Sequence, residues 1–143
     1  MKYIAILAAF AATALAQGIN IAAPAANSQV YRGEWITVEV DKEQPTAPTT
    51  EVALVLSMAR CPSSGCSAGS LGQILYNGPY NPQDEHDGKL PYQNFSVPVP
   101  TSFSVGDQVA LIATRFNLVG SGPYPNIDQR VTPLTVVKGY LDN

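Results

Sequence analysis

The chain is poor in the residues on which most metalloenzymes and hydrolases depend. It has 143 residues, of which one is histidine (His86) and two are cysteine. A zinc or copper site built on His86 would lack a second histidine to complete it. A Ser-His-Asp hydrolase would also have to use His86, and the G-x-S-x-G motif is missing. The sequence therefore predicts neither a metal site nor another cofactor.

Charged residues are scarce as well, at 13% of the chain, and the basic ones are scattered. Eight Lys and Arg residues stand against eleven Asp and Glu residues, which gives a net charge of −3. Nucleic-acid binding depends on clustered cations that displace counterions from phosphates, so it is not expected. Anionic membrane surfaces are disfavoured for the same reason.

An uncharged run stands at the N-terminus. It follows Lys2, extends over residues 3–15 and closes on a small-x-small pattern at Ala16. As a helix it would reach ~20 Å, against a hydrocarbon core of ~30 Å, which argues against both a membrane span and a retained anchor. We predict a signal peptide that is cleaved between Ala16 and Gln17. The two expected parts are therefore the signal peptide, residues 1–16, and one secreted domain, residues 17–143.

The two cysteines lie close together in the segment Cys61-Pro-Ser-Ser-Gly-Cys66. In an oxidising compartment, a pair that flanks Pro and Gly favours a disulfide. The chain-entropy model gives such a short loop about 2 kcal/mol, enough to hold a turn. The redox alternative lacks the two-residue spacing of exchange-active pairs. We predict a structural disulfide between Cys61 and Cys66.

Hydrophobic residues recur with a period near two, and no segment of helical length in the secreted domain keeps a period of 3.6. Pro98 and Pro133 suggest edge positions, because proline cannot donate to a ladder. Short strands with frequent turns predict an all-β fold, a single antiparallel immunoglobulin-like β-sandwich. Seven strands are expected, at residues 19–21, 34–40, 51–58, 71–76, 92–99, 108–116 and 131–137, with loops at 44–50, 79–91 and 120–125.

The acidic residues form no pattern that requires catalysis. Residues 84–87 (Asp-Glu-His-Asp) indicate a solvated loop, because adjacent side chains diverge and EF-hand spacing is missing. A mature chain that begins at Gln17 lacks the N-terminal histidine of secreted copper monooxygenases. A glycosidase with two facing carboxylates stays open as an alternative. We expect a protein that is not an enzyme. The remaining carboxylates are expected in turns or at outward, solvated strand positions: Glu34, Glu39, Glu51, Asp107 and Asp128.

Asn94-Phe95-Ser96 is the one N-glycosylation sequon of the chain. In a strand with Phe95 facing inward, Asn94 faces outward and is accessible, so the sequence permits glycosylation there.

Tyrosine stands beside proline and glycine in three segments. Loops stiffened by proline lose little entropy on binding, and tyrosine offers apolar area together with a hydroxyl group. The alternative is that these rings pack over the ends of the sandwich. The candidate partner-binding residues are Tyr76, Asn77, Tyr80, Tyr92 and Tyr124.

Residues 72–83, 92–97 and 116–125 resemble the necrosis-inducing secreted effector family of plant-associated fungi. The most specific part is Leu-Tyr-Asn-Gly-Pro-Tyr at residues 75–80. The resemblance spans essentially the whole secreted domain. It implies a non-enzymatic effector, with no catalytic residues to transfer.

The resemblance also implies binding to receptor-like kinases of the host plant, suppression of pattern-triggered immunity, and host cell death. The expected location is the apoplast, with the host cytoplasm as a second destination, and a monomer is expected. The alternative that the residues leave open is an extracellular cell-wall or glycan-binding module.

Overall fold

The computed structural model describes residues 18–44, 47–67, 70–84, 88–140 and 142. These residues form β-strands and no helix, which confirms the all-β prediction. The predicted signal peptide, its cleavage site between Ala16 and Gln17, and His86 lie outside the described residues. The strands are β1 (Ile19–Ala23), β2 (Gln29–Tyr31), β3 (Trp35–Lys42), β4 (Thr49–Arg60), β5 (Gln73–Gly78), β6 (Tyr92–Pro98), β7 (Gln108–Val119) and β8 (Tyr124–Val137).

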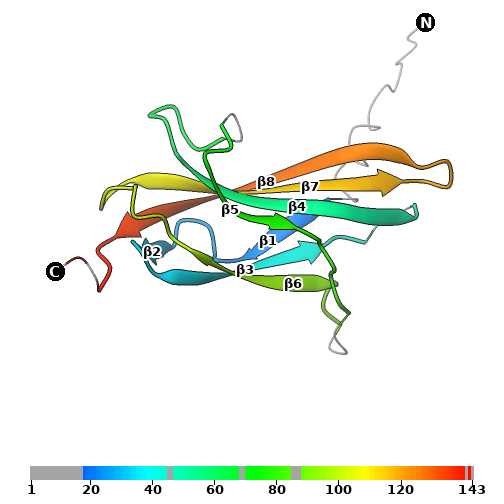
Figure 1. The fold of residues 1–143 in the computed structure, drawn as a ribbon, viewed down its shortest axis with the longest axis horizontal. Helices are drawn as coiled ribbons and strands as arrows, with labels where there is room; N and C mark the ends of the chain where they lie inside the picture. The colour runs from blue at the N-terminus through cyan, green and yellow to red at the C-terminus, as the bar shows by residue number, and fades with distance from the viewer. Residues whose placement is uncertain (1–17, 45–46, 68–69, 85–87, 141, 143) are drawn as a thin grey trace, which may run out of the picture.

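The strands form two sheets that face each other as a β-sandwich (Figure 1). One sheet has the order β1-β3-β6, and the other has the order β2-β8-β7-β4-β5. In the lettering of immunoglobulin domains, β1, β3 and β6 occupy the places of strands A, B and E. Strands β8, β7 and β4 occupy those of G, F and C, with β5 in the place of C′. This order confirms the immunoglobulin-like prediction.

The prediction of seven antiparallel strands is wrong in one respect. An eighth strand, β2, pairs with β8 in parallel, with Gln29 opposite Thr135 and Tyr31 opposite Val137. Three residues are too few to display a period of two, so this strand leaves no signal in the sequence. β2 is a strand only because its backbone pairs with the end of β8.

The segment expected as a loop at 120–125 is shorter in the structure, because β8 already begins at Tyr124 and pairs with β7 from there to Thr135. Hydrogen-bonded pairs alternate along an antiparallel ladder. The N–H of Val136 donates to the carbonyl of Asp107 at 2.9 Å, so the even-numbered residues of β8 bond to β7. Pro125 and Pro133 are odd-numbered, and neither one removes a bond to β7.

The two proline predictions have different outcomes. Pro98 lies on β6, which is an edge strand, as predicted. Pro133 lies on β8, which is an inner strand of its sheet, but β2 covers the outer side of β8 only from Thr135 to Val137, so Pro133 itself stands at an edge position. The proline is tolerated there because its nitrogen faces away from β7, on the side where the N–H of Asn27 donates to its carbonyl.

The core lies between the sheets and follows the period-two alternation of the sequence. Its inward side chains are almost fully buried, which removes apolar area from water on both sheets. They include Val38 and Val40 of β3, Leu54, Leu56 and Met58 of β4, Phe95 and Val97 of β6, Val109 and Leu111 of β7, and Leu134 and Val136 of β8.

A second, small cluster lies on the outer side of the five-stranded sheet. Ala59, Ala110 and Ile112 are buried there beneath the loop that joins β4 to β5. The loop is closed by the disulfide between Cys61 and Cys66, which confirms the predicted pair. The N–H of Cys61 also donates to the carbonyl of Gln108, which continues the β4–β7 ladder into the loop.

Candidate functional site

The interior of the sandwich becomes polar toward one end. Beyond Ala113, the next inward residue of β7 is Arg115, whose side chain is fully buried. On β8 the residue opposite Arg115 is Asp128. A charge can remain inside a protein only when it is paired and hydrogen bonded, so this end requires a network of partners.

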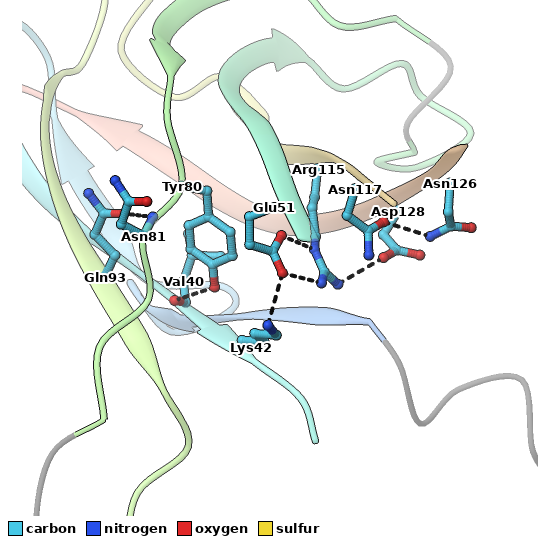
Figure 2. A network of polar contacts seen from close by, with 10 residues as sticks. All are labelled: Val40, Lys42, Glu51, Tyr80, Asn81, Gln93, Arg115, Asn117, Asn126 and Asp128. Carbon is cyan, nitrogen blue, oxygen red and sulfur yellow. Dashed lines mark hydrogen bonds and ion pairs between the residues drawn. The ribbon is translucent and has the colours of Figure 1, made fainter. Parts of the chain in front are cut away.

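The network joins three strands around the guanidinium of Arg115 (Figure 2). Nε and Nη2 of Arg115 donate to the two carboxylate oxygens of Glu51, at 2.7 and 2.6 Å. Nη1 donates to Oδ2 of Asp128 at 3.1 Å. The ammonium group of Lys42 lies 3.1 Å from Oε1 of Glu51. We call these four residues the inter-sheet charge cluster, in which two cations balance two carboxylates.

The cluster corrects the expectation that Glu51 and Asp128 are merely solvated. Burial alone would lower the pKa of Arg115, but the hydrogen bond and charge of Glu51, with the charge of Asp128, raise it. Arg115 therefore stays protonated. Both carboxylates are engaged as acceptors by a permanent cation. The arrangement fastens β4, β7 and β8 together and extends to β3 through Lys42.

Tyr80 lies beside the cluster and is 1% exposed. Its hydroxyl group donates to the carbonyl of Val40 at 3.1 Å. Burial, and then the negative charge of Glu51, raise the pKa of Tyr80 above its ordinary value, so it stays neutral. Its ring packs near Phe95, with centroids 6.5 Å apart.

A pocket of about 300 Å³ opens beside the cluster. Lys42 belongs to both, and the volume is at the lower end of the range for small-molecule sites. No group of three or more His, Cys, Asp and Glu residues that could hold a metal ion occurs within the described part of the chain. The lining residues are Lys42, Glu43, Gln44, Pro82, Asp84 and Pro91.

The outer face of the three-stranded sheet carries a carboxylate pair on β3. Burial, followed by the hydrogen bond and charge of Glu39, raises the pKa of Asp41 to about 6, although Lys89 acts in the opposite direction. Asn94 of β6 lies opposite Glu39 and is exposed, whereas Phe95 is buried. The outward orientation of Asn94 is therefore confirmed, and its glycosylation stays a prediction.

The five residues predicted to bind a partner do not share one surface. Tyr80 is buried, so it cannot present its ring, and this part of the prediction is wrong. Tyr76 packs against Phe95 at 4.6 Å between centroids, and its hydroxyl group donates to the carbonyl of Pro79. The physical reason is that both rings pack against Phe95 and the core, whereas the alternative raised for the tyrosine loops placed such rings over the ends of the sandwich.

The other three predicted residues are accessible but far apart in the topology. Asn77 is exposed on the edge strand β5, and Tyr92 is half-buried at the start of β6, with the ammonium of Lys89 5.7 Å from its ring. Tyr124 is 56% exposed at the hairpin between β7 and β8, where it pairs with Val119. Their role in binding stays a prediction.

Within the described residues, no helix is long and apolar enough to cross a membrane. The chain matches the model of the Nis1 family over residues 13–135. It belongs to this family. The Nis1 family is a family of fungal effector-like proteins, which fits the expected effector class. No match to the chain was found among curated proteins.

This Nis1 family member has a second feature that sequence reasoning missed, the outer face of its five-stranded sheet. We call its uncovered part the neutral face, because its outward residues carry no charge. Its most exposed large hydrophobic residues are Ile127 and Ile74, at 64% and 56%. The neutral face comprises Ile74, Val55, Thr114, Phe116, Ile127, Gln129 and Val131, with Asn77 at its border.

Both missed features have a signal in the sequence of this Nis1 family member. Arg115 continues the inward series Val109, Leu111 and Ala113, so its position predicts a buried cation. Outward positions of the same strand, such as Thr114 and Phe116, hold no charge. The solvated face of a mildly acidic protein would normally contain some charged residues. The partner of Arg115, Glu51, is 64 positions away in the chain, and only the pairing of β4 with β7 brings the two together.

Proposed function

We propose that this protein is a secreted fungal effector that binds receptor-like kinases of the host plant's immune system and suppresses pattern-triggered immunity. The observation that carries the proposal is the match to the Nis1 family over residues 13–135. The Cys61–Cys66 disulfide is consistent with an extracellular protein. Host cell death is the outcome that we expect when the effector is abundant.

The neutral face is the surface that we assign to the kinase. Ile127 and Ile74 are exposed, and Phe116 of the central strand β7 lies on the same face. Together they supply apolar area that a partner can cover without desolvating a charge. The sequon residue Asn94 lies on the outer face of the other sheet. A glycan there would leave the neutral face open.

The experiment is a binding measurement between the secreted, processed protein and purified cytoplasmic kinase domains of plant receptor-like kinases. We expect saturable binding in solution and a weaker oxidative burst after chitin or flagellin treatment of leaves that contain the protein. The absence of both effects would reject the proposal.

Two matched variants test the surface. Ile127→Lys adds a charge to the neutral face, and we expect at least about a tenfold loss of affinity, because the lysine must be desolvated. Thr37→Lys adds the same charge to the exposed outer face of β3, and binding should be unchanged. Equal losses for the two variants would contradict the assignment to the neutral face.

A second candidate function, glycan binding, is favoured by one observation. The rings of Tyr31 and Tyr140 stack with centroids 6.2 Å apart, and both are exposed. Paired aromatic rings of this kind offer apolar faces to sugar rings. Retention of the protein on insoluble chitin, glucan or cellulose, lost in Tyr140→Ala, would support this function. Passage through all three polymers would exclude it.

A further inference from the structure

Part of β8 offers an unpaired edge. The backbone N–H and C=O groups of the odd-numbered β8 residues point away from β7. At residues 133–137 these groups form hydrogen bonds with Asn27 and with β2 and the residues that flank it. From Ile127 to Val131, no strand pairs with this edge among the described residues. The N–H and C=O groups of Ile127, Gln129 and Val131 therefore point away from β7, in the plane of the sheet, toward this unpaired edge. Such a row is the template on which strand addition occurs.

We propose that this edge binds the same edge of a second copy of the chain. The two β8 strands run antiparallel and are centred on Gln129, so a two-fold axis passes beside that residue. The five-stranded sheets of the two copies then continue as one sheet. This inference goes beyond the proposed function and replaces the monomer expected from the sequence.

The side chains are complementary in this register. On the outer face, Ile127 lies opposite Val131 of the second copy, which forms an apolar cross-strand pair on each side of the axis. On the inner face, Asp128 lies opposite Arg130 of the second copy, so each copy contributes to two ion pairs. Registers shifted by two residues place Asp128 opposite Asp128, or Arg130 opposite Arg130. Like charges directly opposite each other are destabilising, which selects the centred register.

Arg130 is available for such a pair. Among the described residues it forms no ion pair, and its guanidinium donates to the carbonyl of its own neighbour Gln129 at 3.3 Å. A second strand replaces that contact with a backbone N–H donor and frees the guanidinium for Asp128. Asp128 already accepts from Arg115 through Oδ2, and a carboxylate can accept from two cations.

Two prolines limit the length of the pairing. Pro125 and Pro133 both point their nitrogen atoms toward the open edge, and in the centred register each lies opposite the other. Neither one has an N–H group, so pairing ends at Ile127 and Val131. The two prolines therefore keep the strand pairing between the copies short, and they still permit a closed dimer. The interface is small, so we expect association in the range of roughly 10 µM to 1 mM.

Cysteine cross-linking gives the sharpest test. In the secreted, processed protein, Gln129→Cys places the new cysteines of the two copies opposite each other. Their Cα atoms are then about 5.5 Å apart, a distance that a disulfide can span. We expect a covalent dimer on mild oxidation. Ile127 is exposed as well but lies opposite Val131 of the second copy, so Ile127→Cys should form no covalent dimer. No dimer for Gln129→Cys, or equal dimer for both variants, would overturn the proposal.

Sedimentation of the unmodified protein provides the second test. The apparent mass should rise toward twice that of one chain with concentration. Gln129→Pro removes an outward N–H without touching β7, and it should weaken association at least about tenfold. Gln129→Ala, which keeps the N–H, should associate like the unmodified protein. A single species up to roughly 1 mM, or association that Gln129→Pro leaves unchanged, would overturn the proposal.

Arg130→Glu checks the ion pairs without altering the backbone. It should weaken association, whereas Arg130→Lys should retain it. Circular dichroism of each variant confirms that the fold is intact before association is compared. Equal association of the two Arg130 variants would overturn the charge pairing in the centred register.

Discussion

Arg115 and Glu51 face each other between strands β7 and β4, and the guanidinium donates to both carboxylate oxygens, at 2.7 and 2.6 Å. The two residues are 64 positions apart in the chain. Replacing a whole buried ion pair by apolar residues can be neutral, but removing one partner leaves an uncompensated charge. The pair therefore makes the polar end of the sandwich sensitive to single substitutions.

Replacement of Arg115 by Met should lower the free energy of unfolding by about 3 kcal/mol, because Glu51 and Asp128 lose their shared cation. Lys42 remains beside Glu51, so the loss should be at the lower end for such pairs. Urea denaturation at pH 7, followed by tryptophan fluorescence, measures the change.

The control is Arg60→Met, the same substitution at a guanidinium that is largely exposed and paired with Asp107. Exposed pairs contribute little, so this variant should lose much less stability. Equal losses of stability for the two variants would show that Arg115 in the inter-sheet charge cluster contributes no more to stability than an exposed arginine.

Tyr80 should affect stability, and Tyr124 should not. Tyr80→Ala removes a buried ring and should cost about 3 to 5 kcal/mol. Tyr80→Phe loses only the hydrogen bond to Val40 and should cost about 1 kcal/mol. Tyr124→Ala lies at an exposed position and should stay within about 0.5 kcal/mol. Thermal unfolding of the three variants would reject this ranking if Tyr124→Ala were the least stable.

Asp41 should make the fold less stable above pH 6 than below pH 4. Its pKa is raised from 3.8 to about 6 in the folded protein, chiefly by burial and then by Glu39. The folded state thus favours the protonated acid, and stability falls as the pH rises from about 4 to 6. After discounting for solvent screening, the effect is on the order of 1 kcal/mol.

Asp41→Asn should remove this dependence. We expect its urea midpoint to exceed that of the unmodified protein at pH 7 and to match it at pH 4. Glu39→Gln is the companion variant, and it should give part of the same gain. A gain for Asp41→Asn that is equal at both pH values would contradict the titration of Asp41.

Loss of the disulfide should loosen the loop between β4 and β5 more than the sandwich. The double replacement of Cys61 and Cys66 by Ser should cost about 2 kcal/mol, because the closed loop is short. The same loop buries Ala110 and Ile112, so hydrogen exchange should quicken near Gln108 and Ala110. Faster exchange in the three-stranded sheet, with no change in β4 or β7, would contradict this account.

The strands that the sequence predicted best are those with alternating inward residues. Val38 and Val40 of β3, and Phe95 and Val97 of β6, are buried as the period of two requires. The first half of β8 was missed because Pro125 and the neighbouring glycines indicate a turn. That segment is a strand because β7 offers it a complete partner, residue by residue, from Val119 onward.

The sequence alone determined the all-β class, the immunoglobulin-like sandwich and the Cys61–Cys66 pair, because alternation and cysteine spacing are local properties of the chain. Tertiary structure decided that Tyr80 is buried and Tyr76 packs against Phe95, that Arg115 meets Glu51, and that residues 127–131 of β8 lie at an open edge. Each of these depends on which strands become neighbours. That choice is made by packing two sheets over one core, and no short window of sequence contains it.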